Sequence, residues 1–158
     1  VSPFQLASAY SVFANNGIFK DFKLLKDAEV HSRRVISQLT ASNILKALEM
    51  VTIDGTGKAA NVNGFSQGGK TGTAHQIKAG SGYAEDLYRA SFVGITPLNK
   101  QSLTIFVSID DPGLNSYTGG AVAAPVFAKI AENTLNHLGY FEDEWIWRNI
   151  RYKNSWKY

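Results

Sequence analysis

Apolar residues at helical spacing predict two helices in the first third of the chain. Ser2 is an N-cap and Pro3 a favourable first helical residue, and Asn16 with Gly17 ends this helix. Its apolar face comprises Phe4, Leu6, Ala7, Tyr10, Phe13 and Ala14. Ser37 caps the second helix, and Gly55 and Gly57 end it. The apolar positions of the second helix are Ile44, Leu45, Leu48 and Val51.

Alternating and β-branched residues predict strands outside these helices. Residues 18–30 alternate apolar and charged side chains, which predicts one short exposed strand. Residues 88–95 and 103–109 predict an antiparallel pair, because the connector 96–101 suits a hairpin. Pro125 then begins a long helix that ends at Gly139. Its predicted inward positions are Val126, Phe127, Ile130, Ala131, Thr134, Leu135 and Leu138.

The last eighteen residues differ in composition from the rest and divide the chain into a domain over residues 1–140 and a tail over 141–158. The tail holds all the tryptophans of the chain, Trp145, Trp147 and Trp156. We expect its aromatic side chains to pack on the domain or on a neighbour. A helix on a membrane surface is the alternative, although its apolar pattern is not cleanly periodic. No function is assigned to this tail.

Composition excludes several classes of protein without naming a partner. Hydrophobic residues make up 44% of the 158, which is enough for a packed core and excludes disorder. The net charge of +3 is too small for a dense basic nucleic-acid surface. The absence of cysteine excludes a disulfide scaffold and a thiolate zinc site. No apolar run is long enough to span a membrane, so we expect any export signal or anchor to lie outside this sequence.

Residues 64–71 match the pattern G-x-x-x-x-G-K-[ST] of a phosphate-binding loop. Such a loop needs a buried strand before it and a helix that starts at the lysine. Residues 59–63 are too polar for a central strand, and Gly72 between two threonines is poor helix material. The flanks therefore argue against nucleotide binding.

The alternative is that residues 70–76 form a strand that begins at a glycine-rich entry. Alternation then places Thr71 and Thr73 on one face with Gly72 between them. An ammonium group and two hydroxyls could hold a substrate carboxylate, while Gly72 would let a ligand backbone lie against the strand edge. The order helix, helix, three strands, helix predicts an α/β (α+β) fold with an antiparallel sheet covered by helices.

The segment Lys70-Thr71-Gly72 is the K-T-G element of β-lactamases and penicillin-binding proteins. With residues 1–7, 55–57, 69–74 and 91–94, in this order, the chain resembles the C-terminal part of the transpeptidase domain of class B penicillin-binding proteins. The resemblance spans residues 1–140. Residues 109–112 and 117–127 are most similar to the septal cell-division transpeptidases.

The resemblance implies a serine D,D-transpeptidase that cross-links peptidoglycan stem peptides through an acyl-enzyme and is the target of β-lactams. The family's nucleophile lies in S-x-x-K and its proton-relay serine in S-x-N, and neither spacing occurs here. Both elements precede K-T-G in the family, whose core sheet has five strands. We therefore expect the chain to supply three strands and to need the N-terminal part of the same domain, which carries the nucleophile, as its partner.

The resemblance also implies roles for individual residues. Lys70 would anchor the substrate or β-lactam carboxylate and stabilise anionic states, with an ordinary solvated lysine as the alternative. Thr71 and Thr73 would bind that carboxylate, and the Thr73 amide would form half of the oxyanion hole. Gly72 would permit close approach of the ligand, and Gly69 is assigned to the same substrate site. Lys70 and Thr73 are thus the candidate catalytic residues.

The other residues near the motif are assigned no catalytic role. His75 follows the motif but is far in sequence from His31 and His137, so we expect neither a metal nor a cofactor. Asp110 and Asp111 precede Pro112 and are interpreted as loop-forming, and we interpret Tyr117, Gly119 and Gly120 as a structural turn that could also border the cleft.

The resemblance implies a place on the periplasmic side of the inner membrane, an anchor in an N-terminal segment outside this sequence, and divisome proteins as partners. The alternative function is a noncatalytic β-lactam or peptidoglycan sensor on the same scaffold.

Overall fold

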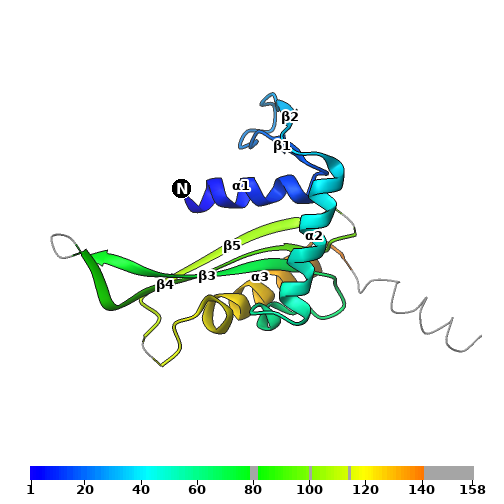
Figure 1. The fold of residues 1–158 in the computed structure, drawn as a ribbon. Coiled ribbons are helices and arrows are strands. Elements are labelled where there is room, and N and C mark those ends of the chain that lie inside the picture. The colour runs from blue at the N-terminus through cyan, green and yellow to red at the C-terminus, as the bar shows by residue number, and fades with distance from the viewer. Residues whose placement is uncertain (79–81, 100, 114, 141–158) are drawn as a thin grey trace, which may run out of the picture.

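The computed structural model describes residues 1–78, 82–99, 101–113 and 115–140, so the predicted tail lies outside the described residues. The helices and turns, which Figure 1 shows with the strands, are α1 (Pro3–Ala14), α2 (Gln38–Ile53), the 3-10 turn η1 (Lys58–Ala60), the π-helical turn η2 (Gly119–Ala123) and α3 (Ala124–His137). The strands are β1 (Ile18–Lys20), β2 (Ser32–Arg34), β3 (Gly68–Lys78), β4 (Gly82–Thr96) and β5 (Leu103–Asp110).

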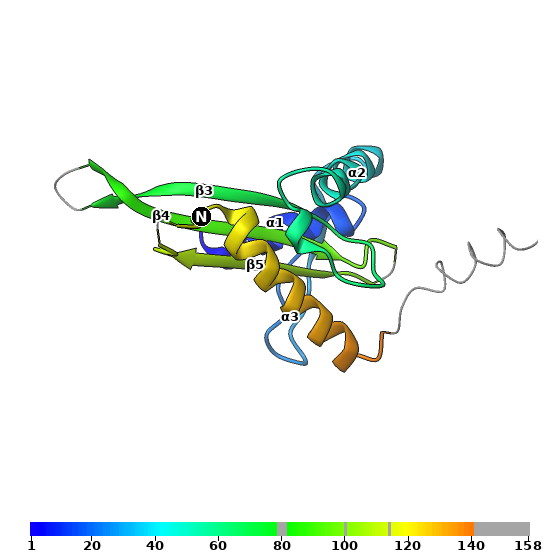
Figure 2. The same ribbon diagram turned by 90° about the horizontal axis from the view of Figure 1, so that it is seen from below.

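An antiparallel sheet of strand order β3-β4-β5 forms the centre of the described part of the chain. Helix α1 lies over one face of this sheet and α3 crosses the other face, while α2 stands beside β3 (Figures 1 and 2). The predicted mixed fold with a helix-covered antiparallel sheet is confirmed. None of the helices among the described residues is long and apolar enough to cross a bilayer.

The predicted starts of α1 and α2 are confirmed, and each is fixed by a local hydrogen bond to its capping serine. At α1, the Ser2 hydroxyl accepts from the Gln5 amide at 3.2 Å and the Gln5 side chain accepts from the Ser2 amide at 2.8 Å. This reciprocal pair satisfies two amides that a helix start leaves free. At α2, the Ser37 hydroxyl accepts from the Thr40 amide at 3.0 Å. The predicted end of α1 is confirmed as well, with Gly17 in the left-handed region at φ 84°.

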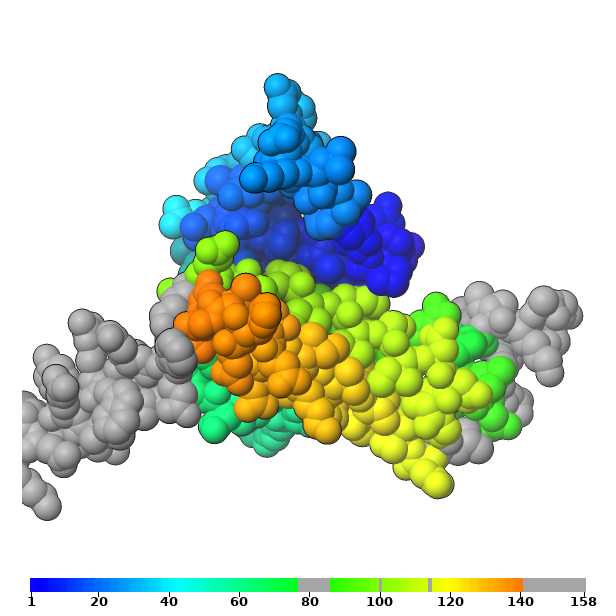
Figure 3. All heavy atoms as spheres, turned by 180° about the vertical axis from the view of Figure 1, so that it is seen from behind, coloured from blue at the N-terminus to red at the C-terminus, as the bar shows by residue number. Residues whose placement is uncertain are grey.

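The prediction of one strand over residues 18–30 is wrong in extent. Only Ile18–Lys20 is a strand, and it pairs with β2, which the sequence did not reveal because Ser32–Arg34 is polar and does not alternate. The chain between them leaves Phe22 58% and Leu24 82% exposed. Figure 3 shows the segment over residues 18–34 projecting from the rest of the molecule, and the Phe22 ring contacts Phe4 of α1 with ring centroids 4.5 Å apart.

The core lies between the sheet and α3. Phe92 and Phe127 are fully buried with ring centroids 5.0 Å apart, and Ala131 and Leu135 continue the contact along α3. Gly94 makes the contact possible, since a Cβ there would lie 2.4 Å from the Phe127 ring.

The predicted inward face of α3 is too wide. Val126, Ile130 and Leu138 are 38%, 43% and 53% exposed, so they do not point into the core. The buried stripe is instead the set spaced by four residues, Phe127, Ala131 and Leu135. A helix that crosses a sheet makes contact along one narrow seam, and apolar residues beside the seam stay outside it.

Candidate functional site

Strand β3 carries the lysine, threonines and glycine of the candidate site and lies at an edge of the sheet. Lys70 pairs in register with Val93, and Thr71 with Phe92. Within the described residues β3 has a strand neighbour on one side only, and α2 packs against its first residue, Gly68. An extended peptide could therefore pair with the outer edge only beyond this contact. The strand continues through Lys70 with no helix start, which removes the structural basis of the phosphate-loop alternative.

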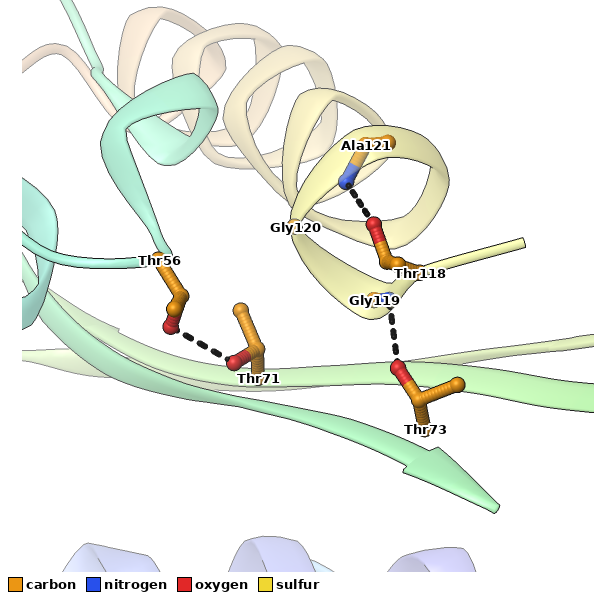
Figure 4. A pocket seen from close by; sticks show the side chains of 7 residues that line it. All are labelled: Thr56, Thr71, Thr73, Thr118, Gly119, Gly120 and Ala121. Carbon is orange, nitrogen blue, oxygen red and sulfur yellow. Dashed lines mark hydrogen bonds between the residues drawn. The ribbon is translucent and has the colours of Figure 1, made fainter. Parts of the chain in front are cut away.

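Thr71 and Thr73 meet in a pocket of about 400 Å³ between β3 and the start of η2. Their side chains share one face of the strand, as predicted. Figure 4 shows them facing two other segments, the turn after α2 and the first residues of η2. The pocket is lined by Thr56, Thr71, Thr73, Thr118, Gly119, Gly120 and Ala121.

Hydrogen bonds tie each β3 threonine to one of these segments. The Thr71 and Thr56 hydroxyl oxygens are 2.8 Å apart, and either group is able to donate. The Gly119 amide donates to the Thr73 hydroxyl at 3.1 Å. The polar groups of the lining include four threonine hydroxyls and no carboxylate, so the pocket offers hydrogen-bond donors to an anionic group without a negative charge that would repel it.

Glycines bring η2 against the strand. A Cβ on Gly119 would lie 2.2 Å from the Ser91 carbonyl oxygen and 2.5 Å from that of Gly72. A Cβ on Gly120 would lie 2.2 Å from the Thr56 carbonyl oxygen. Gly119 and Gly120, interpreted from the sequence as a turn, therefore build one wall of the pocket.

Gly72 and Gly69 have packing reasons of their own. A Cβ on Gly72 would lie 2.5 Å from the Ser91 hydroxyl oxygen, and one on Gly69 would lie 2.4 Å from the Phe92 ring. The absence of a side chain at Gly72 thus leaves room for Ser91 of β4. Its predicted second use, close approach of a ligand, stays a prediction.

The structure does not bring Lys70 into the pocket with the threonines. Its side chain is exposed, and its ammonium group donates to the Thr71 carbonyl at 2.8 Å. Because side chains alternate along a strand, Lys70 and Gly72 lie on the face opposite Thr71 and Thr73. A long flexible lysine next to the strand edge is still able to reach a ligand that lies along that edge.

An aromatic stack borders the site further along the strand. His75 is exposed, and its ring centroid lies 4.6 Å from that of Tyr88. The Tyr88 ring stacks on Tyr117 at 4.2 Å, which holds the loop before η2. This stack was not predictable from the sequence, because its three rings come from β3, β4 and a loop, which are far apart along the chain.

The two aspartates predicted to form a loop secure its beginning. Asp110 ends β5 and forms an ion pair with Arg89, the residue opposite it on β4. The hydrogen bond from the Arg89 guanidinium lowers the pKa of the Asp110 carboxyl. Asp111 is in the left-handed region at φ 49°, and its amide donates to the Tyr88 carbonyl at 2.8 Å. Asp111 is therefore a structural residue of the turn, as predicted, whereas the loop prediction is wrong for Asp110, which is the last residue of β5 and pairs with Arg89.

Two further pocket residues escaped the sequence analysis. Thr56 lies between Gly55 and Gly57, a segment that indicated the end of a helix and contributed to the family resemblance, but it was assigned no role in the site. Thr118 is the N-cap of η2, and its hydroxyl accepts from the Ala121 amide at 3.3 Å. A threonine before a glycine pair is the local signal that could have identified this cap. In the described parts of the chain, no group of three histidine or acidic side chains is placed to hold a metal ion.

Comparison with known proteins gives a consistent result. The sequence profile of the family described as penicillin binding protein transpeptidase domain matches residues 1–132. Stage V sporulation protein D of Bacillus subtilis is 36% identical over 152 residues, which cover 88% of this chain and 23% of that protein. The probable peptidoglycan D,D-transpeptidase PenA of Neisseria flavescens is 37% identical over 88% of this chain and 35% of that protein.

A solved structure extends the comparison to the fold. The transpeptidase domain of Burkholderia pseudomallei penicillin-binding protein 3, in its apo form, matches with a TM-score of 0.78 and 38% identity. The match covers 90% of this chain and 44% of that structure. The chain thus spans between about a quarter and a third of the length of the two relatives above, and less than half of this domain.

Proposed function

The chain belongs to the family of penicillin binding protein transpeptidase domains, and from this premise we propose that residues 1–140 form the C-terminal part of a peptidoglycan D,D-transpeptidase. In the proposed reaction, a serine of the upstream part attacks the carbonyl of a D-Ala-D-Ala stem peptide. The C–N bond breaks, the serine proton passes to the departing D-Ala amine, and an acyl-enzyme remains. An amine of a second stem then takes the acyl group and restores the serine. β-Lactams acylate the same serine.

The observation that carries the proposal is the meeting of the Thr71 and Thr73 hydroxyls with the Gly119 amide beside an open strand edge. A stem peptide extended along β3 would place its terminal carboxylate against the two hydroxyls. The Thr73 amide would supply half of the oxyanion hole, and the Lys70 ammonium would stabilise negative charge at the reacting centre. Gly72 and Gly69 would leave the strand accessible to the substrate backbone.

The proposed partner of this chain is the N-terminal part of the same domain. Exposed apolar residues on α1 and α2 support this, since Phe4, Leu39 and Met50 are 49%, 71% and 56% exposed. We propose a septal role, a location facing the periplasm, an anchor supplied by an N-terminal segment, and divisome proteins as further partners. The aromatic tail is proposed to pack on the domain or on a neighbour.

Labelling of the complete domain with a fluorescent penicillin tests the proposal. We expect a covalent adduct on the upstream serine that survives denaturing electrophoresis. Lys70→Ala and Thr71→Val should lower the rate of labelling at least about tenfold, because each removes a group that stabilises an anion. Lys129→Ala, which changes an exposed lysine on α3, is the matched control and should label like the wild type.

A turnover assay with a D-Ala-D-Ala stem peptide completes the test. Release of D-Ala with formation of a cross-linked dimer supports the proposed activity. A stable adduct without release from the stem peptide would indicate a sensor instead. A folded complete domain without any adduct, or with an adduct on residues 1–158, would contradict the assignment.

A further inference from the structure

The two threonines of β3 differ in what holds their hydroxyl groups. Thr73 accepts a hydrogen bond from a backbone amide, that of Gly119, which has one proton to give. Thr71 bonds to another hydroxyl, that of Thr56, and either partner is able to donate. The backbone therefore fixes the direction of the hydrogen bond at Thr73. The direction of the bond at Thr71 depends on whether the Thr56 hydroxyl donates or accepts.

A threonine hydroxyl has one proton and two lone pairs. Since Thr73 already accepts from Gly119, its own proton is free to point into the pocket. Thr71 gives its proton to an anion in the pocket only if it accepts from Thr56. An anionic ligand therefore selects the order in which Thr56 donates to Thr71 and both β3 hydroxyls donate to the ligand. If the side chain at position 56 had no hydrogen-bond donor, the Thr71 hydroxyl would donate to the ligand without accepting a hydrogen bond itself.

The backbone around Thr56 is held in place from two sides. The Gly57 amide donates to the Val51 carbonyl at 2.9 Å, which joins the turn to the end of α2. Gly120 lies directly against the Thr56 carbonyl, where a Cβ would come within 2.2 Å. Thr56 is thus fixed with respect to α2 and η2, and its hydroxyl reaches Thr71 from a rigid support (Figure 4).

We infer that Thr56 is a positioning residue that orients the Thr71 hydroxyl toward the carboxylate of the ligand. This inference rests on the proposed function, since it takes the ligand to be a stem peptide or β-lactam with a free carboxylate. Thr56 acts through Thr71, and its contribution is specific to an anionic ligand. It extends the site beyond β3 to the turn between α2 and η1.

The test compares two β-lactams in the complete domain, one with a free carboxylate and its methyl ester. Thr56→Val keeps the shape of the side chain and removes its hydroxyl. We expect it to slow acylation by the acid about 3- to 10-fold, the range for one hydrogen bond between neutral groups. Acylation by the ester should change less than about twofold, since the ester carries no charge. Thr56→Ser should restore the rate with the acid.

A double-mutant cycle separates positioning from direct contact. If Thr56 acts through Thr71, Thr56→Val should add nothing to the loss caused by Thr71→Val. Additive losses would overturn the inference in favour of direct contact with the ligand. Equal slowing of acid and ester by Thr56→Val would overturn it in favour of a purely structural role, and no slowing would also overturn it.

The control variant Thr134→Val removes a hydroxyl that binds the Ile130 carbonyl on α3, away from the pocket. It should leave both rates unchanged. Failure of the proposed function has a different signature, because the wild-type domain would then react with neither β-lactam. A wild type that reacts while Thr56→Val behaves identically refutes the inference about Thr56 alone.

Discussion

The two faces of the sheet are closed to different degrees. On one face α3 buries Ala124, Phe127, Ala131 and Leu135. On the other, α1 lies entirely within the described part of the chain and buries one residue, Val12. Helix α2, beside β3, leaves Met50 and Ile53 56% and 59% exposed. The α3 face is a closed core, and the side of α1 and α2 is the one that the upstream part of the domain is proposed to cover.

The residues of the candidate site are divided between these two faces of the sheet. The pocket belongs to the closed face, because η2 leads directly into α3 and Thr71 shares its face with Phe92. Lys70 belongs to the other face. The packing within this chain therefore positions the threonines of the pocket. Lys70 lies on the side where the part that carries the nucleophile is proposed to dock.

Removing the central side chain of the closed face should have the largest effect. Phe127→Ala leaves a cavity against Phe92 and Gly94, and we expect a loss of about 3–5 kcal/mol in the free energy of unfolding. Chemical denaturation of the complete domain measures it. Lys129→Ala, at an exposed position of the same helix, should cost under about 0.5 kcal/mol. Similar values for the two variants would show that the α3 face is not the core.

The second-largest effect is expected from a larger side chain at Gly119, where the pocket meets the core. Gly119→Ala forces a methyl group to within 2.2 Å of the Ser91 carbonyl oxygen, so η2 must move away from β3. We expect a cost of about 2–3 kcal/mol together with a fall in the rate of β-lactam acylation.

Gly113→Ala is the matched control for this substitution. Gly113 has open space around it and φ 91°, so alanine meets only backbone strain there, about 1 kcal/mol. Acylation by this variant should stay close to that of the wild type. If Gly119→Ala acylates normally, the position of η2 does not matter to the site.

The open face is tested by Met50→Ala in the complete domain. If the upstream part covers α2, removal of this side chain should cost about 1–2 kcal/mol through lost apolar burial. Lys46→Ala, on the same helix and exposed, should change stability by less than about 0.5 kcal/mol. A Met50 variant as stable as the wild type would show that this part of α2 stays in contact with solvent.

The smallest expected effect concerns the ion pair between Arg89 and Asp110. Since the pKa of folded Asp110 lies below its ordinary value of 3.8, the pair stabilises the fold above that value. The contribution is lost as the pH falls through the folded pKa. The difference in Tm between wild type and Asp110→Asn should therefore be present at neutral pH and vanish in acid, and 1 M salt should reduce it. A difference that persists in acid would assign the effect to packing.

Local interactions explain what the sequence by itself determined about this protein. The helix caps at Ser2 and Ser37, the strand at Lys70 and the hairpin of β4 and β5 were predictable, because capping, alternation and turn formation involve residues a few positions apart. The K-T-G element and its neighbours also indicated the family. These features fix the elements and the edge strand of the site.

Only the tertiary structure decided which residues complete the site and which apolar residues form the core. The bond from Gly119 to Thr73 joins positions 46 residues apart, and that from Thr56 to Thr71 joins positions 15 apart. Likewise, α3 offered more apolar positions than its seam with the sheet could bury, and contact with Phe92 selected Phe127 over Val126. Periodicity reports which side chains are apolar, whereas burial depends on the surface that a distant segment brings against them.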